Sequence, residues 1–302
     1  MRRKLDAALL LDKPPGISSN AALQSAKRLY RARKAGHAGT LDPLASGLLV
    51  VLFGEATKFA GPLLQAPKEY LARVRLGEMT TTGDAEGETL ARREVRLSDA
   101  EIEVVLARFR GVVRQVPPMY SALKHGGRPL YELAREGRSI EREAREVEIH
   151  TLELLARDGT DLELHVRCSK GTYVRTLAED IGAALGVGAH LAGLRRTSAG
   201  GLDVRQASTL EALERLDEAE RDARLLPLEA LLADLPRLEL DAQQAGRFCN
   251  GQRIRVPDGG RGLCGVFGPQ RRVLGLGDLA AGGELRPLRL IARSPEAVQA
   301  AE

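Results

Sequence analysis

The chain has 302 residues, of which 43% are hydrophobic and 28% charged, so one large domain plus a small one is expected. No run of 18 apolar residues occurs, and we expect no membrane-spanning helix. The net charge is only +4 but uneven, because basic residues crowd positions 1–34 and acidic residues crowd 211–222. A basic surface facing phosphate is allowed by this pattern and not required by it.

The N-terminus begins basic, but Asp12 and Lys13 interrupt the apolar run Leu9–Leu11 at once. No signal peptide is therefore expected, and the protein is predicted to be cytoplasmic. The three cysteines are odd in number, far apart and without a CxxC pair, so the sequence favours buried small hydrophobes over a disulfide or a zinc site: Cys168, Cys249 and Cys264.

The first predicted elements are a short strand at Leu9–Leu11 and a helix capped by Ser18 or Ser19 and ended by Gly36. Basic residues crowd the C-terminal half of this helix. There their positive charges interact favourably with the negative end of the helix dipole. A solvated helix end and an RNA-facing surface are equally good interpretations of this cluster.

Alternating apolar and charged residues predict half-buried strands at 70–76 and 162–168. Ser98 and Glu101 form a capping box for a helix closed by Gly111. A further helix is expected near 173–185. Strands and helices mix without a regular βαβ period, which favours an α+β domain on a largely antiparallel sheet.

Two segments stand apart from this body. Residues 115–146 are rich in Gly, Pro and charge and resemble an insertion. After an acidic, Leu-rich helical stretch at 209–235, short β-like pieces alternate with Gly-rich turns. We therefore predict a main domain over 1–235 and a small all-β domain over 236–302.

Turn-forming residues are most concentrated in GHAGTLDPLASGLL, residues 36–49, which leads into an apolar run. Asp42 precedes Pro43 and is biased to extended conformations, while the glycines permit close approach of a ligand. The Asp42 carboxylate is thus predicted to project from a stiff loop at a cleft. By itself an Asp before Pro is also typical of a plain turn.

This loop and its surroundings resemble the TruB-type tRNA pseudouridine-55 synthases. The likeness continues in family order over essentially the whole chain, through LLLDKPPGISS, GEATKF, KEY, TTGDAEG, VPPMYSALKHGGRPLYELAREG, CSKGTYVRTLAEDIG and GAHLAGLRR. One departure is Thr81, where family members often carry Asp. The resemblance implies a pseudouridine synthase fold, a thumb at 115–146 that closes over the RNA, and a PUA-like C-terminal domain.

The resemblance also implies functional residues. Asp42 matches the catalytic aspartate, Arg175 the arginine that pairs with it, and Tyr70 the tyrosine that stacks on the flipped uracil and assists proton removal at C5. The helix surface and the core are the structural alternatives for Arg175 and Tyr70. The residues assigned to substrate binding are His37, Tyr173, Leu194, Lys13, Asp84, Lys124 and Arg128.

The implied reaction isomerises uridine 55 in the T-loop of tRNA, after the base is flipped out and stacked on an aromatic ring. A carboxylate suits it, as nucleophile or as base, and both roles stay open. The change needs no external energy, so no cofactor and no metal are expected. The expected partner is the tRNA T-arm, bound through phosphates and shape by a monomer that needs no protein partner.

Two other functions compete with this interpretation. A non-catalytic tRNA-binding or RNA-folding protein would use the same thumb and C-terminal domain, but the presence of Asp42, Tyr70 and Arg175 together favours catalysis. A guide-RNA-dependent rRNA pseudouridine synthase would share the catalytic core, and the complete thumb favours the stand-alone tRNA enzyme. The sequence contains neither a GxGxxG nor a GxxxxGK[ST] phosphate loop, which argues against a nucleotide-binding enzyme.

Overall fold

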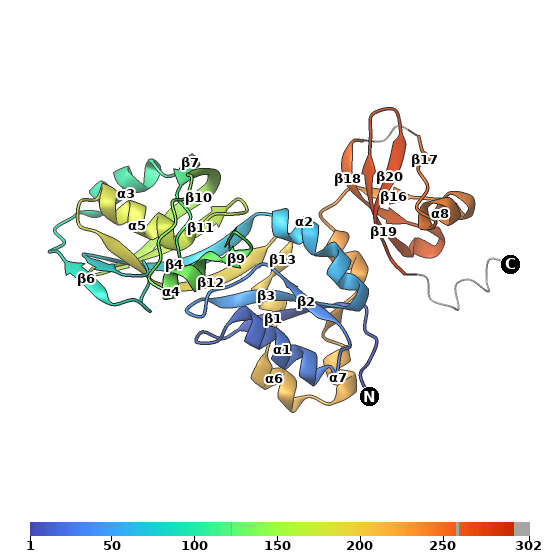
Figure 1. Ribbon diagram of the computed structural model, residues 1–302, viewed down its shortest axis with the longest axis horizontal. Helices are drawn as coiled ribbons and strands as arrows, with labels where there is room; N and C mark the ends of the chain where they lie inside the picture. The colour runs from blue at the N-terminus through green and yellow to red at the C-terminus, as the bar shows by residue number, and fades with distance from the viewer. Residues whose placement is uncertain (122, 258–259, 293–302) are drawn as a thin grey trace.

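The computed structural model describes residues 1–121, 123–257 and 260–292. An elongated main body of strands and helices carries a smaller β domain at one end (Figure 1). The α+β class and the separate C-terminal β domain predicted from the sequence are confirmed. Among the described residues, no helix is both long and apolar enough to cross a membrane.

One sheet organises the main body, with eleven strands among the described residues and a main path in the order β14-β1-β3-β12-β4-β11-β10-β7. Most neighbours are antiparallel, as expected, whereas β1–β14 and β3–β12 pair in parallel. The main-path strands are β1 (Ala8–Lys13), β3 (Ser46–Phe53), β4 (Lys68–Leu76), β7 (Gly111–Gln115), β10 (Arg145–Asp158), β11 (Asp161–Cys168), β12 (Ala189–Ala199) and β14 (Ser208–Thr209). Beside this path lie β2 (Ala35–Ala38), β13 (Leu202–Asp203) and β15 (Leu225–Leu226).

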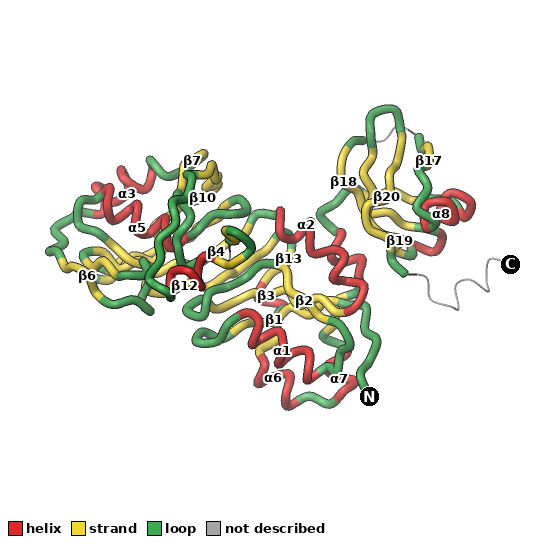
Figure 2. The backbone as a smooth tube through the Cα atoms, viewed as in Figure 1, coloured by secondary structure: helices red, strands yellow, loops and turns green. Residues whose placement is uncertain are grey.

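Helices cover the two halves of this sheet differently (Figure 2). On the β4–β11–β10 half, α3 (Asp99–Ala107) and α5 (Val174–Ala184) pack on one face and share an apolar cluster with the strands. On the β1–β3 half, α1 (Ser19–Leu29) and α6 (Leu210–Arg215) cover one face, while α2 (Ala60–Gln65) packs on the other. Strand β3 is therefore buried on both faces, which explains its continuous apolar sequence.

Two helices begin at the capping residues predicted from the sequence. Ser18 caps α1 by accepting a hydrogen bond from the Ala21 N–H at 3.1 Å, and Ser98 and Glu101 form the predicted box at α3. The cysteines are free, and Cys168 and Cys264 are buried as expected.

The predicted helix ends are wrong in two places. Helix α1 ends at Leu29, since Arg31 adopts a left-handed φ of 51°, and Gly36 lies in β2 instead of closing the helix. Helix α3 ends at Ala107, and Gly111 opens β7 with φ +87°.

The stretch 209–235 is also not one helix. It breaks into α6, α7 (Glu218–Asp222), β15 and a 3₁₀ turn, Leu228–Leu232. Acidic side chains of α7 pair with the basic N-terminal region: the Arg3 guanidinium lies 2.5 Å from the Asp222 carboxylate, and Arg31 contacts Glu218. These ion pairs neutralise part of the basic cluster.

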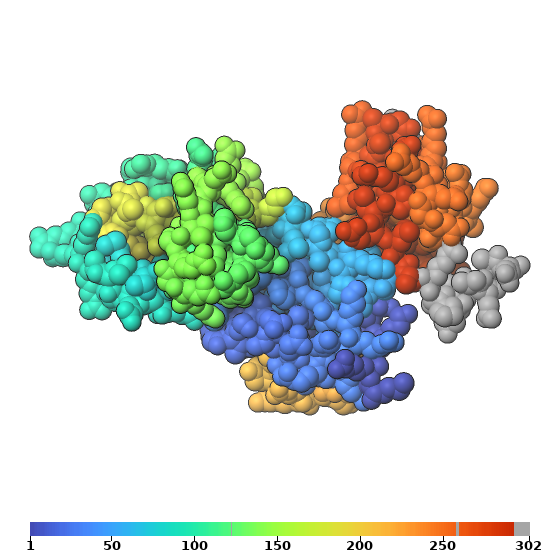
Figure 3. All heavy atoms as spheres, viewed as in Figure 1, coloured from blue at the N-terminus to red at the C-terminus, as the bar shows by residue number. Residues whose placement is uncertain are grey.

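The predicted thumb lies between β7 and β10, with position 122 outside the described residues. It carries a hairpin of β8 (Lys124–His125) and β9 (Arg128–Pro129), followed by α4 (Leu130–Arg135). In the space-filling view this segment, green, stands at the front of the body (Figure 3). A second small hairpin, β5 (Glu78–Thr80) with β6 (Thr89–Arg92), extends from the end of β4.

The C-terminal domain has its own five-stranded sheet in the described residues, ordered β16-β18-β19-β20-β17, and its own apolar cluster around Phe248. Its elements are β16 (Arg237–Glu239), α8 (Ala242–Cys249), β17 (Ile254–Arg255), β18 (Gly262–Phe267), β19 (Val273–Leu279) and β20 (Glu284–Leu290). Residues 258–259 and 293–302 of the predicted domain lie outside the described residues.

A second apolar cluster joins this domain to the main body, since Phe267 and Leu276 pack with Leu231, Leu232 and strand β3. A polar latch adds to it. Lys58 Nζ donates to the Leu290 carbonyl at 2.7 Å, and Glu55 Oε2 accepts from the Ala292 N–H at 2.6 Å.

Candidate active site

The Asp42 loop connects β2 to β3 and is held by backbone contacts on several sides. Ser19 is buried, and its Oγ donates to the Leu41 carbonyl at 2.9 Å and accepts from the Leu41 N–H at 2.7 Å. The Pro43 carbonyl accepts from the Gly16 N–H at 2.8 Å. The Asp42 side chain remains 47% exposed, so a stiff loop presents this carboxylate to solvent, as the sequence predicts.

Lys13 supports this loop from behind. It is fully buried, and its Nζ donates to the carbonyls of Pro14 at 2.9 Å, Ile17 at 2.7 Å and Pro43 at 3.5 Å. Burial lowers the pKa of the Lys13 ammonium to about 8. The side chain expected to contact substrate therefore lies behind the loop, and it lines neither of the two cavities beside Asp42.

Arg196 holds the same loop from the other side. Its buried guanidinium donates to the carbonyls of Leu48 at 2.7 Å, Gly39 at 3.1 Å and Thr40 at 3.5 Å. Gly47 has φ +97°, and a Cβ at this position would clash with the Arg196 backbone. In the sequence Arg196 is only the last residue of the motif GAHLAGLRR. Its contacts with the Asp42 loop form between β12 and β3, which are far apart in the chain, so no local sequence pattern predicts them.

Arg175 lies between two carboxylates. Its guanidinium contacts Asp42, and its Nε is 3.1 Å from the Asp84 Oδ2. The Arg175 side chain is only 6% exposed, which rules out the helix-surface alternative. A buried guanidinium orients an aspartate by charge-assisted hydrogen bonding, so Asp42 is held in place by a fixed cation.

Asp84, expected among the substrate contacts, is buried against Arg175. Its Oδ1 accepts from Thr82 Oγ1 at 2.5 Å and from the Glu86 N–H at 3.1 Å. Its carboxylate is thus bonded within the protein and pairs with the guanidinium that contacts Asp42, while Asp84 also lines the cavity on the thumb side of Asp42.

Beside Asp42 an inner pocket of about 200 Å³ brings together residues from five distant segments. Tyr70, Tyr173 and Leu194 line it together with Asp42 and Arg175, as expected from the resemblance. Burial raises the pKa of both the Tyr70 and Tyr173 phenols, and the Arg196 cation opposes this rise at Tyr70. Both phenols are therefore protonated at neutral pH.

An outer cavity of about 680 Å³ continues from this pocket toward the thumb. His37 lies in its wall on strand β2, and burial lowers the pKa of its imidazole. The thumb contributes Tyr131 and Arg135, with the Arg135 guanidinium 5.5 Å from the Tyr131 ring centre. Their positions follow from the fold of the thumb, and the sequence analysis did not assign them.

The two thumb residues that were predicted to bind substrate, Lys124 and Arg128, do not lie at these cavities. Lys124 is exposed on the hairpin, and Arg128 is paired with Glu136 at 2.5 Å and Glu132 at 3.6 Å. Neither lines the inner or the outer cavity.

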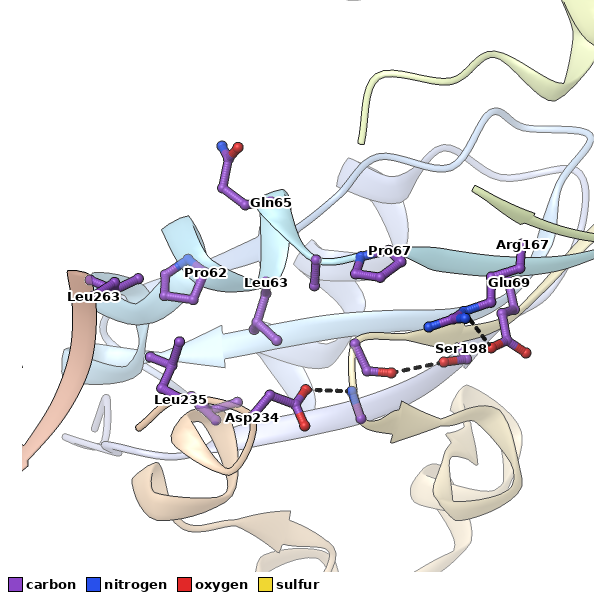
Figure 4. A pocket seen from close by; sticks show the side chains of 14 residues that line it. Pro62, Leu63, Gln65, Pro67, Glu69, Arg167, Ser198, Asp234, Leu235 and Leu263 are labelled. Carbon is purple, nitrogen blue, oxygen red and sulfur yellow. Dashed lines mark hydrogen bonds and ion pairs between the residues drawn. The ribbon is translucent and has the colours of Figure 1, made fainter. Parts of the chain in front are cut away.

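A separate cavity of about 560 Å³ lies at the junction with the C-terminal domain, between α2, the start of β4 and Leu263 of β18 (Figure 4). Its polar side chains are engaged with close neighbours: Asp234 accepts from the Gly201 N–H at 2.7 Å, and the Arg167 guanidinium is 3.5 Å from the Glu69 carboxylate. We therefore place the candidate active site at Asp42 and not here.

Comparisons with known proteins agree with this site. The TruB family pseudouridylate synthase N-terminal domain matches residues 27–174, the tRNA pseudouridylate synthase B C-terminal domain matches 175–233, and the pseudouridine synthase II TruB C-terminal domain matches 236–291.

Two curated relatives, both named tRNA pseudouridine synthase B, come from Burkholderia mallei and an Azoarcus species. Each is 55% identical to the chain; the first match covers 96% of the chain and 98% of the relative, the second 96% of both.

Among solved structures, an H/ACA ribonucleoprotein bound to a substrate RNA containing 2′-deoxyuridine is similar with a TM-score of 0.75 and 25% identity, covering 96% of this chain and 87% of that one. A Cbf5-Nop10-Gar1 complex gives 0.74 and 27%, covering 95% and 84%. With three family models in order along its length and the Asp42–Arg175 pair at its pocket, the chain belongs to the TruB family of pseudouridylate synthases.

Proposed function

We propose that the enzyme converts uridine 55 in the T-loop of tRNA to pseudouridine. The observation that carries the proposal is the inner pocket, which Asp42, held by Arg175, lines together with Tyr70. Relatives 55% identical over nearly the full chain are named tRNA pseudouridine synthase B, whereas the H/ACA structures are only about half as similar. This difference supports tRNA over a guide-dependent rRNA substrate.

The chemistry breaks the N1–C1′ bond, turns the uracil and joins C5 to C1′, while C5 loses a proton and N1 gains one. The Asp42 carboxylate acts at the sugar, by attack at C1′ or by taking a proton at C2′. Both routes need an ionised carboxylate in fixed orientation, which the Arg175 contact supplies.

In this proposal Tyr70, which lines the inner pocket, stacks on the detached uracil. Its phenol is protonated in the free enzyme, since burial raises its pKa. If it takes the C5 proton, it does so as phenolate, and the neighbouring Arg196 cation lowers the cost of that anion.

A base in the T-loop reaches this pocket only after it is flipped out, and its phosphates must be gripped elsewhere. Arg135 in the outer cavity and the exposed arginines of the C-terminal domain are suited to this role, with the thumb closing over the T-arm. We further propose that a monomer acts without a protein partner, in the cytoplasm where tRNA is processed.

The test is incubation with an unmodified tRNA transcript, followed by site-resolved detection of pseudouridine. We expect one modified position, uridine 55. A transcript with cytidine at that position serves as the control and should gain no pseudouridine. Modification of a different uridine, or of none, would contradict the proposal.

A further inference from the structure

Ser121, at the base of the thumb, carries a buried hydroxyl without a bond. Its side chain is 5% exposed, and its Oγ has no hydrogen-bond partner among the described residues. Burying a hydroxyl without a partner costs free energy, so such a group indicates a missing ligand.

The backbone of Ser121 is fixed, which aims this hydroxyl. Its N–H donates to the Met119 carbonyl at 2.9 Å, and its carbonyl accepts from the Tyr131 N–H at 3.1 Å. The second bond ties Ser121 to the first turn of α4, so its position follows that of the thumb.

Ser121 stands at the opening between the two cavities. It lines both the inner pocket and the outer cavity, as do Asp42 and Arg175. Among the described residues it is the thumb's one contribution to the inner pocket. The Tyr173 phenol is its neighbour there: the Ser121 hydroxyl lies near enough for hydrogen bonding to lower the pKa of that phenol against the effect of burial, although the two oxygens are not in hydrogen-bond geometry.

The remaining polar groups of the inner pocket are largely engaged. Thr172 Oγ1 donates to the Ser169 carbonyl at 2.9 Å, and Asp42 and Arg175 contact each other. A flipped uracil would bring two carbonyl oxygens and an N3–H into this space, and each needs a partner once water is excluded.

We propose that the Ser121 hydroxyl hydrogen-bonds the polar edge of the flipped uracil and is a specificity-determining residue of this enzyme. The inference rests on the proposed function. Turning the base about its N3–C6 axis exchanges N1 with C5 and O4 with O2. A hydroxyl can rotate and can donate or accept, so one side chain serves the base before and after it turns.

The bond also links the thumb to the occupied pocket. Because Ser121 is tied to α4, a uracil in place holds the thumb in the position seen here, and an empty pocket offers it no such contact. The effect of losing the hydroxyl should therefore fall on the step after RNA binding.

The test compares wild type, Ser121→Ala and Ser121→Cys in single-turnover assays at saturating tRNA. Ser198→Ala is the matched control, since Ser198 is a serine in the wall of the separate junction cavity (Figure 4). We expect Ser121→Ala to slow the reaction about three- to tenfold, the value of one hydrogen bond, with tRNA Kd within about twofold. The rate of Ser121→Cys should lie between the rates of Ser121→Ala and wild type, and the rate of Ser198→Ala should equal that of wild type.

A second substrate separates contact with the base from a structural role. A tRNA carrying 4-thiouridine at the target position replaces O4 by a weaker acceptor. Its rate penalty relative to uridine should be larger for wild type than for Ser121→Ala, because the variant has no hydroxyl to lose.

Two outcomes would overturn the inference: an undiminished rate for Ser121→Ala, or a full 4-thiouridine penalty in that variant. Thermal melting of each variant shows whether a slow rate comes from misfolding. Failure of the proposed function looks different, because then wild type makes no pseudouridine at all.

Discussion

Tyr70 on β4 and Arg196 on β12 occupy paired register positions, and the Arg196 guanidinium acts on the Tyr70 phenol against the burial that raises its pKa. The same guanidinium holds the Gly39 and Thr40 carbonyls. One buried cation thus serves both the loop that carries Asp42 and the tyrosine that lines the pocket beside it.

Arg196→Met should raise the Tyr70 pKa further, since a nearby cation favours the phenolate. The measurement is a difference titration of tyrosinate absorbance, with Tyr70→Phe subtracted in each background. Arg195→Met is the control, because Arg195 pairs with Asp12 at 2.7 Å and is 40% exposed. An unchanged Tyr70 titration in a folded Arg196→Met protein would refute the electrostatic role.

Asp42→Asn should abolish isomerisation while leaving tRNA affinity within a few fold of wild type. One carboxylate acts on the sugar, whereas binding is spread over many phosphate contacts. Single-turnover assays and filter binding measure the two properties separately. Substantial turnover by the purified variant would remove Asp42 from the mechanism.

Asp84→Asn should slow the chemical step about tenfold to a hundredfold, the value of one interaction with a charged group, because it removes the carboxylate paired with the buried Arg175 guanidinium. The reason is that Asp84 holds Arg175 and does not line the inner pocket. Glu88→Gln is a suitable control, because Glu88 is an exposed carboxylate of the same loop and lines neither the inner pocket nor the outer cavity. If Asp84→Asn changes only tRNA affinity, then Asp84 contacts substrate instead of positioning Arg175.

Lys68 predicts a pH-dependent stability. Its Nζ donates to the Leu64 carbonyl at 2.7 Å and the Ala66 carbonyl at 2.6 Å, and burial lowers its pKa to about 8 from 10.5. Between about pH 8 and 10.5 the unfolded state binds the extra proton, so this group makes the free energy of unfolding rise with pH, by up to about 3 kcal/mol.

Urea unfolding of wild type and Lys68→Met across this pH range isolates the contribution. The difference between them should grow with pH, while Lys170→Met, at an exposed lysine, should show no such trend. A difference that stays constant from pH 7 to 10.5 would mean that the ammonium is not desolvated in solution.

The C-terminal arginines should matter for long RNA only. Arg255→Glu with Arg289→Glu, both exposed, should weaken binding of full-length tRNA and lower its salt dependence by about one unit of slope per lost phosphate contact. A minimal T-arm hairpin should be modified at the wild-type rate. Arg96→Glu, 81% exposed at the other end of the body, is the charge-matched control. Equal losses on both RNAs would place these arginines at the active site.

Local chemistry in the sequence predicts where elements begin. Ser18 and the Ser98–Glu101 box cap the helices as expected, because a cap is decided within four residues. The end of α1 was not predictable in this way. Residues 35–38 pair with β3, and that distant partner takes the place of the helical turn expected before Gly36.

In the site, too, features encoded by local motifs were predicted, and features that depend on distant partners were not. Motifs predicted that Asp42, Tyr70, Arg175, Tyr173 and Leu194 belong together, and the structure brings them to one pocket. The supporting roles escaped prediction: Lys13 was expected to bind substrate and Arg196 had no assigned role, but both hold the loop through backbone carbonyls, which carry no sequence signal. Ser121 likewise joined the pocket only through the fold of the thumb.

The apolar cluster and the polar latch that join the C-terminal domain to the main body have a consequence for which RNAs are accepted. If, as proposed, the C-terminal domain grips the RNA, they hold that grip and the base pocket at a set spacing. A stem lengthened by one base pair then presents its loop uridine to Asp42 only by giving up the far contacts. Stem length thereby becomes a criterion of RNA affinity, beside the identity of the flipped base.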